Sequence, residues 1–361
     1  MTVDDILRLC VCPDCRTGLK PVRDTDSSQL LLLFCNQCNL VFPVDDGIPI
    51  LLNRAARNHE VESPLIDEAI ARLRPTVRKT LQSGIESTQR ILLTRIGKRT
   101  WEWEDEAFWS NEYGQAVSAE TEKAWTLRLW EREPFVQRLI EEYGGFASRT
   151  VVDVGAGDGY TFRHLIAPHT SEETVYIAID ISSQGLKLNR KMNPHRRSLY
   201  VVSTASSVPV RRGAVDILMY WGILHHTAEG SGALSAGREL LAREGYILLF
   251  EAVDRPTVAA KLGLKTPHES EHEGRIQLPK LREAIGQDSS LNVVMQRELH
   301  SCLYSVAYRG RVGRVLGGRR MMYRLVSALD HAVIRSVGKF VGPFRPAGVL
   351  MLLRVQGHCA G

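Results

Sequence analysis

A glycine-rich segment near the middle of the chain has the residue types and spacing that bind a small ligand through bare backbone. Residues 153–159 read Asp-Val-Gly-Ala-Gly-Asp-Gly. A β-branched run precedes them at 149–152, and helical apolar spacing follows at 160–166. A strand, a glycine turn and a helix let a ligand approach the main-chain N–H groups at the helix N-terminus. We expect four residues of this turn to contact the ligand: Asp153, Gly155, Ala156 and Gly157.

A carboxylate follows the next apolar run at a distance that suits the same ligand. Residues 175–179 are almost entirely apolar and predict a second buried strand, which Asp180 ends. An acid at this place accepts hydrogen bonds from the two hydroxyls of a ribose. A dinucleotide-binding turn would need a third glycine where Tyr160 stands. Asp180 and the adjacent Ile181 are therefore candidate contacts to a ribose-containing ligand other than a dinucleotide.

Two further motifs follow expected strands at residues 198–202 and 215–222. The first strand leads into Ser-Thr-Ala-Ser-Ser-Val-Pro-Val, which contains Thr204 and Ala205. The second strand contains Trp221 near its end and leads into Leu-His-His-Thr. Together with the G-x-G-x-G turn and Asp180, these segments resemble the class I S-adenosylmethionine-dependent methyltransferases. The resemblance covers roughly residues 100–356 at the level of the fold, and its specific motifs lie within 151–227.

The resemblance implies S-adenosylmethionine as the cofactor. In similar enzymes an aspartate at the position of Thr204 accepts a hydrogen bond from the adenine amino group, so this chain departs from the pattern. A hydroxyl accepts the same bond without charge assistance. The candidate cofactor contacts are Asp153, Gly155, Ala156, Gly157, Asp180, Ile181, Thr204, Ala205 and Trp221.

The order of the expected elements predicts an α/β fold. A fifth strand at 245–251 follows a helix expected at 232–243, and later strands are expected at 291–298 and 348–355. Strands that alternate with helices build a doubly wound, mostly parallel sheet. Combined with the resemblance, this predicts a Rossmann-like methyltransferase sheet of seven strands.

Composition agrees with a globular protein of more than one module. The chain has 361 residues, of which 44% are hydrophobic, and this content is ample for a core. It has no uninterrupted apolar run long enough to span a bilayer and no signal-peptide pattern. Seven cysteines without secretory features favour a reducing, cytoplasmic location. A net charge of +5 does not by itself indicate a nucleic-acid partner.

Four cysteines near the N-terminus have the spacing of a zinc ribbon. Two C-x-x-C pairs are separated by nineteen residues. Each pair makes a tight turn that directs two thiolates at one tetrahedral ion, and closed tetrathiolate sites are structural. Two matched pairs favour zinc over a redox role. Cys10 lies close enough in sequence to compete as a ligand. The predicted zinc ligands are Cys12, Cys15, Cys35 and Cys38.

The residues after the second pair refine this interpretation. Residues 41–52 read Val-Phe-Pro-Val-Asp-Asp-Gly-Ile-Pro-Ile-Leu-Leu. They resemble the small zinc-ribbon activator subunit that supports several tRNA and protein methyltransferases, here fused ahead of a catalytic domain. A four-cysteine ribbon also precedes the catalytic domain of ribosomal RNA guanine methyltransferases. We expect the ribbon at 1–60 to depend on its metal, while the catalytic sheet keeps a core of its own.

Residues 61–145 are expected to form a helical linker and lid. The first part mixes charges with helical apolar spacing, and the second part is rich in aromatic residues. Those side chains either pack on the edge of the sheet or cover the cofactor or a flat substrate. The aromatic residues are Trp101, Trp103, Phe108, Trp109, Tyr113, Trp125 and Trp130. Residues 146–361 are then the methyltransferase domain.

Histidines supply the candidate catalytic bases. His225 and His226 leave the fourth strand toward the expected cleft, although one of them could instead pack or cap the next helix. His268 and His272 lie in an H-E-x-x-H sequence that has no surrounding apolar stripe, which favours a chance match over a protease site. Their loop follows the fifth strand, and such loops line the cleft of open α/β sheets. All four histidines are therefore candidates for a base or a substrate contact.

A basic helical insertion at about 302–346 precedes the last strand. Its apolar residues recur at helical spacing, and its only acid is Asp330. The insertion either packs with a solvated basic face or binds an anionic partner: a phosphorylated substrate, RNA or an acidic membrane surface. Its basic residues are Arg309, Arg311, Arg314, Arg319, Arg320, Arg324, Arg335, Lys339 and Arg345.

Three functions are consistent with these features. The favoured one is methyl transfer to a small-molecule biosynthetic substrate, with oxygen or nitrogen more expected than carbon as the acceptor. The aromatic segment before the sheet and the insertion after it suggest a lidded pocket. The ribbon and the basic insertion support RNA as the alternative substrate. Thr204 supports a third hypothesis, a non-catalytic methyltransferase-like scaffold, which the intact glycine turn and Asp180 oppose.

Overall fold

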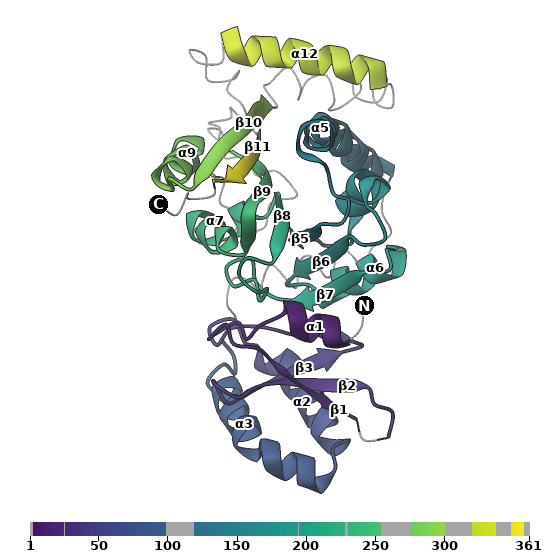
Figure 1. Cartoon of the computed structure of the whole chain (residues 1–361), viewed down its shortest axis with the longest axis vertical. Coiled ribbons are helices and arrows are strands. Elements are labelled where there is room, and N and C mark those ends of the chain that lie inside the picture. The colour runs from purple at the N-terminus through teal and green to yellow at the C-terminus, as the bar shows by residue number, and fades with distance from the viewer. Residues whose placement is uncertain are drawn as a thin grey trace.

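The structure, a computed structural model, contains two β-sheets with their helices (Figure 1). A four-stranded sheet lies at the N-terminal end and a seven-stranded sheet forms the centre. No helix among the described residues is long and apolar enough to cross a membrane. The structure describes residues 3–24, 26–98, 119–193, 195–227, 230–253, 276–299, 320–336 and 348–356.

The seven-stranded sheet is doubly wound and mixed, as predicted. Its strand order is β10-β11-β9-β8-β5-β6-β7, in which all pairs from β9 to β7 are parallel and β11 is antiparallel to both neighbours. The order reverses beside β5, where open α/β sheets bind ligands. The strands are β5 Thr150–Val154, β6 Val175–Asp180, β7 Ser198–Val202, β8 Val215–Trp221, β9 Leu241–Ala252, β10 Leu291–Leu299 and β11 Gly348–Val355.

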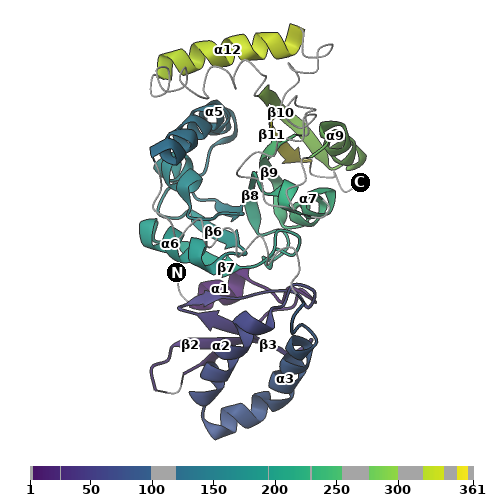
Figure 2. The same ribbon diagram turned by 180° about the vertical axis from the view of Figure 1, so that it is seen from behind.

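Helices flank this sheet on both sides (Figures 1 and 2). On one side, α6 Ser183–Met192 packs beside β6 and β7, and α5 Ala119–Tyr143 contacts β9 and β11 through Phe135. On the other side, α7 Gly230–Arg238 and α9 Leu278–Gln287 lie beside β9 and β10.

One predicted boundary is wrong. The helix expected at 232–243 ends at Arg238, and β9 begins at Leu241, four residues before the expected strand. Leu241 pairs with Val215 of β8, so tertiary pairing takes these residues into the sheet. The close approach of α7 to β8 depends on Gly237, where a Cβ would lie 2.1 Å from the Tyr220 hydroxyl oxygen.

The N-terminal sheet is antiparallel and is covered by two helices. The strands are β1 Lys20–Arg23, β2 Leu30–Cys35, β3 Leu40–Asp45 and β4 Ile48–Pro49, preceded by α1 Val3–Leu9. The helices α2 His59–Ala71 and α3 Pro75–Leu93 lie in the region expected to be a linker, and they bury an apolar face with residues of β2 and β3. Asn58 caps α2 and Pro75 occupies the first turn of α3, where its missing N–H costs nothing.

The N-terminal sheet is joined to the edge strand β7 of the large sheet. The Leu51 N–H donates to the Val202 carbonyl at 2.9 Å, and the Val11 N–H donates to the Pro209 carbonyl at 3.0 Å. An exposed edge strand is a site of unwanted pairing, and here the N-terminal segment covers it. The Asp45 carboxylate also lies 2.6 Å from the Lys187 Nζ atom of α6.

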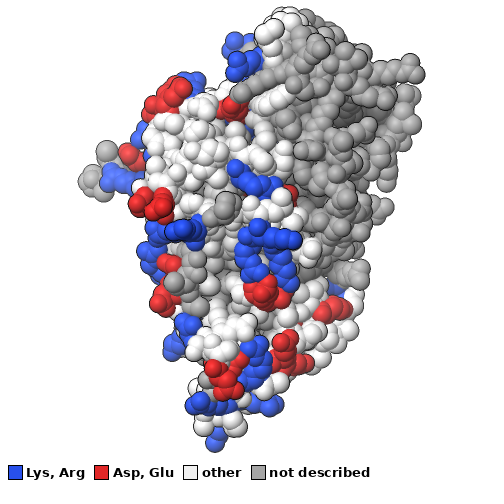
Figure 3. All heavy atoms as spheres, turned by 90° about the vertical axis from the view of Figure 1, so that its right-hand side faces the viewer, with Lys and Arg blue, Asp and Glu red and all other residues white. Residues whose placement is uncertain are grey.

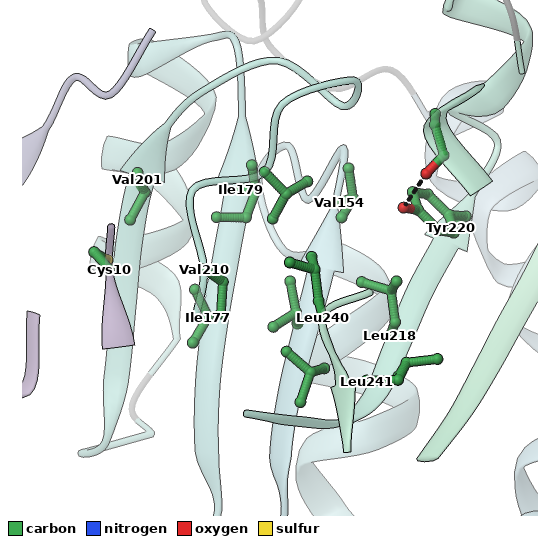
Figure 4. Close-up of a cluster of buried hydrophobic side chains, with 14 of the residues drawn as sticks. Cys10, Val154, Ile177, Ile179, Val201, Val210, Leu218, Tyr220, Leu240 and Leu241 are labelled. Atoms are coloured by element: carbon green, nitrogen blue, oxygen red, sulfur yellow. Dashed lines mark hydrogen bonds between the residues drawn. The ribbon is translucent and has the colours of Figure 1, made fainter. Parts of the chain in front are cut away.

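The two sheets share one hydrophobic core. Cys10, Leu33 and Phe42 belong to the same buried cluster as Ile177 and Val201 of the large sheet. Figure 4 shows Cys10 beside Val201, with Ile177 and Ile179 further into the sheet. The expectation that the catalytic sheet has a core of its own was therefore wrong, because the edge of this sheet is completed by the N-terminal segment. The described part of the face in Figure 3 carries interspersed acidic and basic side chains.

Candidate functional site

The glycine turn lies at the carboxyl end of β5 and is packed too tightly for side chains. Gly155, Gly157 and Gly159 all have positive φ, a backbone region that favours glycine. A Cβ at Gly155 would lie 2.7 Å from a side-chain carbon of Ile223. The Gly155 and Ala156 N–H groups both donate to the Ile179 carbonyl, at 2.8 and 3.0 Å. The turn therefore presents bare backbone in a fixed shape beside the end of β6.

Asp180 ends β6 directly beside this turn. Its Oδ2 atom accepts from the Gly157 N–H at 2.8 Å, and its Oδ1 atom accepts from the Ser182 N–H at 2.8 Å. Two main-chain donors therefore fix the plane of a buried carboxylate. A carboxylate has about four lone-pair sites, so this type of group is also suited to two hydroxyl donors that lie in a cis pair. The bare turn and this carboxylate fit a ribose-containing cofactor.

Asp153 lies beneath the turn and is fully buried. Burial raises the pKa of Asp153 to about 7, since the charged form loses its hydration. The Tyr176 hydroxyl donates to its Oδ2 atom at 3.1 Å. Burial and the nearby Asp180 carboxylate therefore both favour the neutral form of Asp153.

Thr204 follows β7, and Trp221 ends β8, at the same edge of the sheet. Thr204 is buried, and its hydroxyl lies 3.2 Å from the Ser206 hydroxyl. The loop that contains it is held by the N-terminal segment: the Ser207 hydroxyl donates to the Pro13 carbonyl at 3.3 Å. The Trp221 indole N–H is buried without a hydrogen-bond partner among the described residues. A donor in this condition at a ligand-binding edge is suited to an acceptor on a bound molecule.

His225 is oriented by a carboxylate that the sequence analysis did not single out. Its Nδ1 atom lies 2.9 Å from Oε2 of Glu251, at the carboxyl end of β9. The other oxygen, Oε1, accepts from the Ile223 and Leu224 N–H groups at 3.0 and 2.8 Å. Glu251 therefore fixes both the turn that follows β8 and the His225 imidazole. It ends a parallel strand as Asp180 does, and this position was the signal that could have identified it.

The two adjacent histidines differ in their surroundings. The His225 side chain is partly exposed, whereas His226 is buried, and their ring centroids are 4.1 Å apart. With Nδ1 facing a carboxylate, His225 carries its proton there and presents Nε2 as the basic atom. This arrangement favours His225 over His226 as an acceptor of a substrate proton.

Arg132 of α5 is a second residue that the sequence analysis missed. Its guanidinium lies over the rings of Trp221 and Phe250, 4.6 and 4.5 Å from their centroids. It also donates to the Thr161 hydroxyl at 2.8 Å. The side chain is buried, so a positive charge stands at the carboxyl ends of β8 and β9. Charged residues flank Arg132 in a mixed helix, so no sequence signal distinguished it.

The four predicted zinc ligands lie together in the N-terminal sheet. The Sγ atoms of Cys12, Cys15, Cys35 and Cys38 all lie within 4.8 Å of one another. This separation suits four thiolates around one tetrahedral zinc ion. Cys10 lies outside the group, and burial raises the pKa of this thiol to about 12, so it is a core residue and not a competing ligand. The protein therefore has a structural zinc site.

Several other candidates fall outside the described residues. His268 and His272 do so, as do the aromatic residues from Trp101 to Tyr113. Trp130 is half-buried in α5, the helix that also carries Arg132.

Comparisons with known proteins found matches to the segments that form each of the two sheets. A family model described as a methyltransferase domain matches residues 152–249. A UPF0434 protein of Blochmanniella pennsylvanica is 43% identical over 53 residues, which is 15% of this chain and 87% of that protein. A UPF0434 protein of Bordetella pertussis is 39% identical over 59 residues, or 16% of this chain and 87% of its own.

Solved structures of methyltransferases resemble the chain in fold. The plantazolicin methyltransferase BamL, in complex with a substrate analogue and S-adenosylhomocysteine, has 14% identity and a TM-score of 0.45, over 73% of this chain and 96% of its own. The CurJ carbon methyltransferase has 16% identity and a TM-score of 0.39, over 63% and 54% of the two chains.

The protein is an S-adenosylmethionine-dependent methyltransferase of class I. This assignment depends on the strand order, on the glycine turn with Asp180 and on the family match over residues 152–249. Through its zinc-ribbon segment, the chain belongs to the UPF0434 family.

Proposed function

We propose that this methyltransferase acts on a small-molecule biosynthetic substrate and methylates an oxygen or nitrogen atom. The observation that carries the proposal is the His225–Glu251 pair at the carboxyl edge of the sheet. An oxygen or nitrogen nucleophile must lose a proton as it is methylated, and a histidine oriented by a carboxylate can take that proton.

When bound, the cofactor would supply an electrophilic methyl group, whose carbon the acceptor would attack in line as the carbon–sulfur bond breaks and S-adenosylhomocysteine leaves. Alignment and exclusion of water then provide much of the rate enhancement. In our proposal His225 receives the acceptor proton at Nε2, and Glu251 stabilises the resulting imidazolium. His226 packs against the turn that follows β8 and supports it. Arg132 lies over the Trp221 and Phe250 rings and is suited to an anionic group on the substrate.

We propose that the cofactor lies across the carboxyl ends of β5, β6 and β7. Asp180 would accept from both ribose hydroxyls, and Thr204 would accept from the adenine amino group. The glycine turn would hold the methionine portion. Supporting observations are the fixed carboxylate, the bare turn and the unpaired indole donor of Trp221. The remaining proposed contacts are Asp153, Gly155, Ala156, Gly157, Ile181 and Ala205.

The Asp180→Asn variant is expected to weaken cofactor binding by about tenfold or more, because it loses charge-assisted hydrogen bonds. Calorimetric titration with S-adenosylhomocysteine measures the effect. Asp216→Asn is a matched control: its carboxylate also accepts from a main-chain N–H, that of Thr150 at 2.7 Å, but at the start of β8. The control should bind normally. Equal affinities for the Asp180 variant and the unmodified protein would refute the proposed cofactor position.

RNA is the second candidate substrate, favoured by a basic depression in the N-terminal part. Arg54, Arg95 and Lys98 line a shallow hollow of about 500 Å³ together with Ala55, Ile91 and Thr94. The Arg95 guanidinium donates to the Arg54 carbonyl at 3.0 Å, which holds two of these cations near one another. Clustered cations of this kind suit phosphate groups.

A labelled-methyl assay distinguishes the two substrates. The purified protein and methyl-labelled cofactor are incubated with cell extract, which is then separated into small molecules and RNA. We expect label in the small-molecule fraction, and label confined to RNA would overturn this preference. An Arg95→Gln/Lys98→Gln variant provides a further comparison, since it should lose RNA labelling and retain small-molecule labelling.

We also propose a division of the chain. The ribbon occupies about residues 1–60, a helical segment follows to about 145, and the methyltransferase domain extends from 146 with a basic insertion at about 302–346. Within this division, the helices α2 and α3 of the helical segment pack on the N-terminal sheet.

A further inference from the structure

The helix α12, Arg320–Ser336, exposes an apolar stripe along its length. Met321 is 82% exposed, Leu325 55% and Leu329 51%. These residues recur at intervals of four and therefore lie on one helix face. The opposite face contains Val326 and Ile334, which are buried. The helix therefore has two apolar faces. One packs on the protein, and the other is the exposed stripe.

The charged side chains that the structure describes beside this stripe are arginines. Ala328 and Ala332 are exposed beside the three large residues, and Arg324 and Arg335 are exposed along one edge. No acidic residue is among the residues of α12 that are described as exposed. Over residues 302–346 the sequence has nine lysines and arginines and a single acid. An apolar centre with a cationic edge complements a surface that is apolar inside and anionic at its boundary.

The position of α12 relates this surface to the catalytic edge. An Arg297 guanidinium nitrogen donates to the Ser327 hydroxyl at 2.8 Å and holds the helix against β10. Arg297 is in register with Leu350, and Leu350 with Phe250, the residue before Glu251. The helix is therefore attached level with the carboxyl end of β9. Figures 1 and 2 show α12 at the end of the molecule opposite the N-terminal sheet.

We propose that α12 is an interfacial helix that binds an anionic membrane surface. Met321, Leu325 and Leu329 enter the boundary between headgroups and acyl chains, and the arginines along the edge contact lipid phosphates. The helix has seventeen residues and lies in the plane of the surface without crossing it. Because α12 is level with the carboxyl end of β9, membrane binding would turn the substrate side of the sheet toward the lipid.

The exposed residue types favour a membrane over the other anionic partner, RNA. An RNA backbone is contacted through cations and aromatic stacking, and it gains nothing from three exposed aliphatic side chains. The most exposed residue of the stripe, Met321, would instead be left in water beside a polar backbone. A lipid boundary uses both the apolar stripe and its cationic edge.

Sedimentation of the full chain with lipid vesicles tests the proposal. We expect binding to vesicles of equal parts phosphatidylcholine and phosphatidylglycerol. Binding to phosphatidylcholine alone should be weaker by about tenfold or more. Replacement of the stripe by Met321→Gln/Leu325→Gln/Leu329→Gln should weaken binding to the mixed vesicles by about tenfold or more. The Arg324→Gln/Arg335→Gln variant should remove much of the preference for phosphatidylglycerol.

A matched control is available at the far end of the molecule. Leu93 and Ile96 are 61% and 53% exposed near the end of α3, so Leu93→Gln/Ile96→Gln replaces two exposed aliphatic side chains and should leave vesicle binding unchanged. S-adenosylhomocysteine titration of each variant confirms that the fold is retained and is independent of the proposed substrate. No sedimentation of the unmodified chain with mixed vesicles would overturn the proposal. A stripe variant that binds the vesicles normally would also overturn it. So would a stripe variant that loses self-association or RNA binding and keeps vesicle binding.

Discussion

The His225→Ala variant is expected to lower kcat by about 10²–10⁴-fold, the usual contribution of a positioned general base. Cofactor affinity should remain unchanged, because the imidazole contacts Glu251 and not the glycine turn. Steady-state rates with the accepted substrate, and calorimetry with S-adenosylhomocysteine, measure the two quantities. His226→Ala is the control, and we expect a much smaller loss of kcat because this ring is buried and the Glu251 carboxylate orients His225 instead.

The Glu251→Gln variant tests how the histidine is held. A glutamine can still accept from the Ile223 and Leu224 N–H groups, but it no longer stabilises a protonated imidazole. The variant should therefore lower kcat while leaving the affinity for S-adenosylhomocysteine unchanged. An unchanged kcat would show that Glu251 has only a structural role. If both His225→Ala and Glu251→Gln kept full activity, the proposed base would be incorrect.

Removing two zinc ligands should have the second large effect. Cys35→Ser/Cys38→Ser is expected to eliminate the bound zinc and unfold the N-terminal sheet, because tetrathiolate binding contributes on the order of 10 kcal/mol to such small folds. Cofactor affinity should fall as well, since Cys12, Cys35 and Phe42 share a core cluster with strands β5 to β7. Metal analysis, thermal unfolding and S-adenosylhomocysteine titration measure these outcomes.

The control for the zinc experiment is Cys10→Ala. This thiol is buried in the same core but lies outside the four-cysteine group, so the variant should keep its zinc and lose only part of its packing energy. A zinc content well below one per chain in the unmodified protein would contradict the ribbon. Unaltered cofactor affinity after zinc loss would mean that the shared core does not couple the two sheets.

The local features of the sequence determined most of the elements and the identity of the ligands. Strands β6, β7 and β11 begin and end where the hydrophobic runs do, because each run is short and largely buried on both faces. The glycine turn was recognisable because positive φ and close packing leave few alternatives to glycine. The zinc site was recognisable because two C-x-x-C turns impose their own local geometry.

Other features depend on pairing between distant segments and were decided only by the tertiary structure. The boundary between α7 and β9 is set by pairing of Leu241 with Val215, which overrides local helical spacing. The role suggested for Glu251 depends on its meeting His225 across two strands, twenty-six residues apart in sequence. The N-terminal sheet completes the edge of β7 through contacts such as that of Leu51 with Val202. Periodicity and spacing describe one segment at a time, whereas such contacts arise when non-local strands bury a common core.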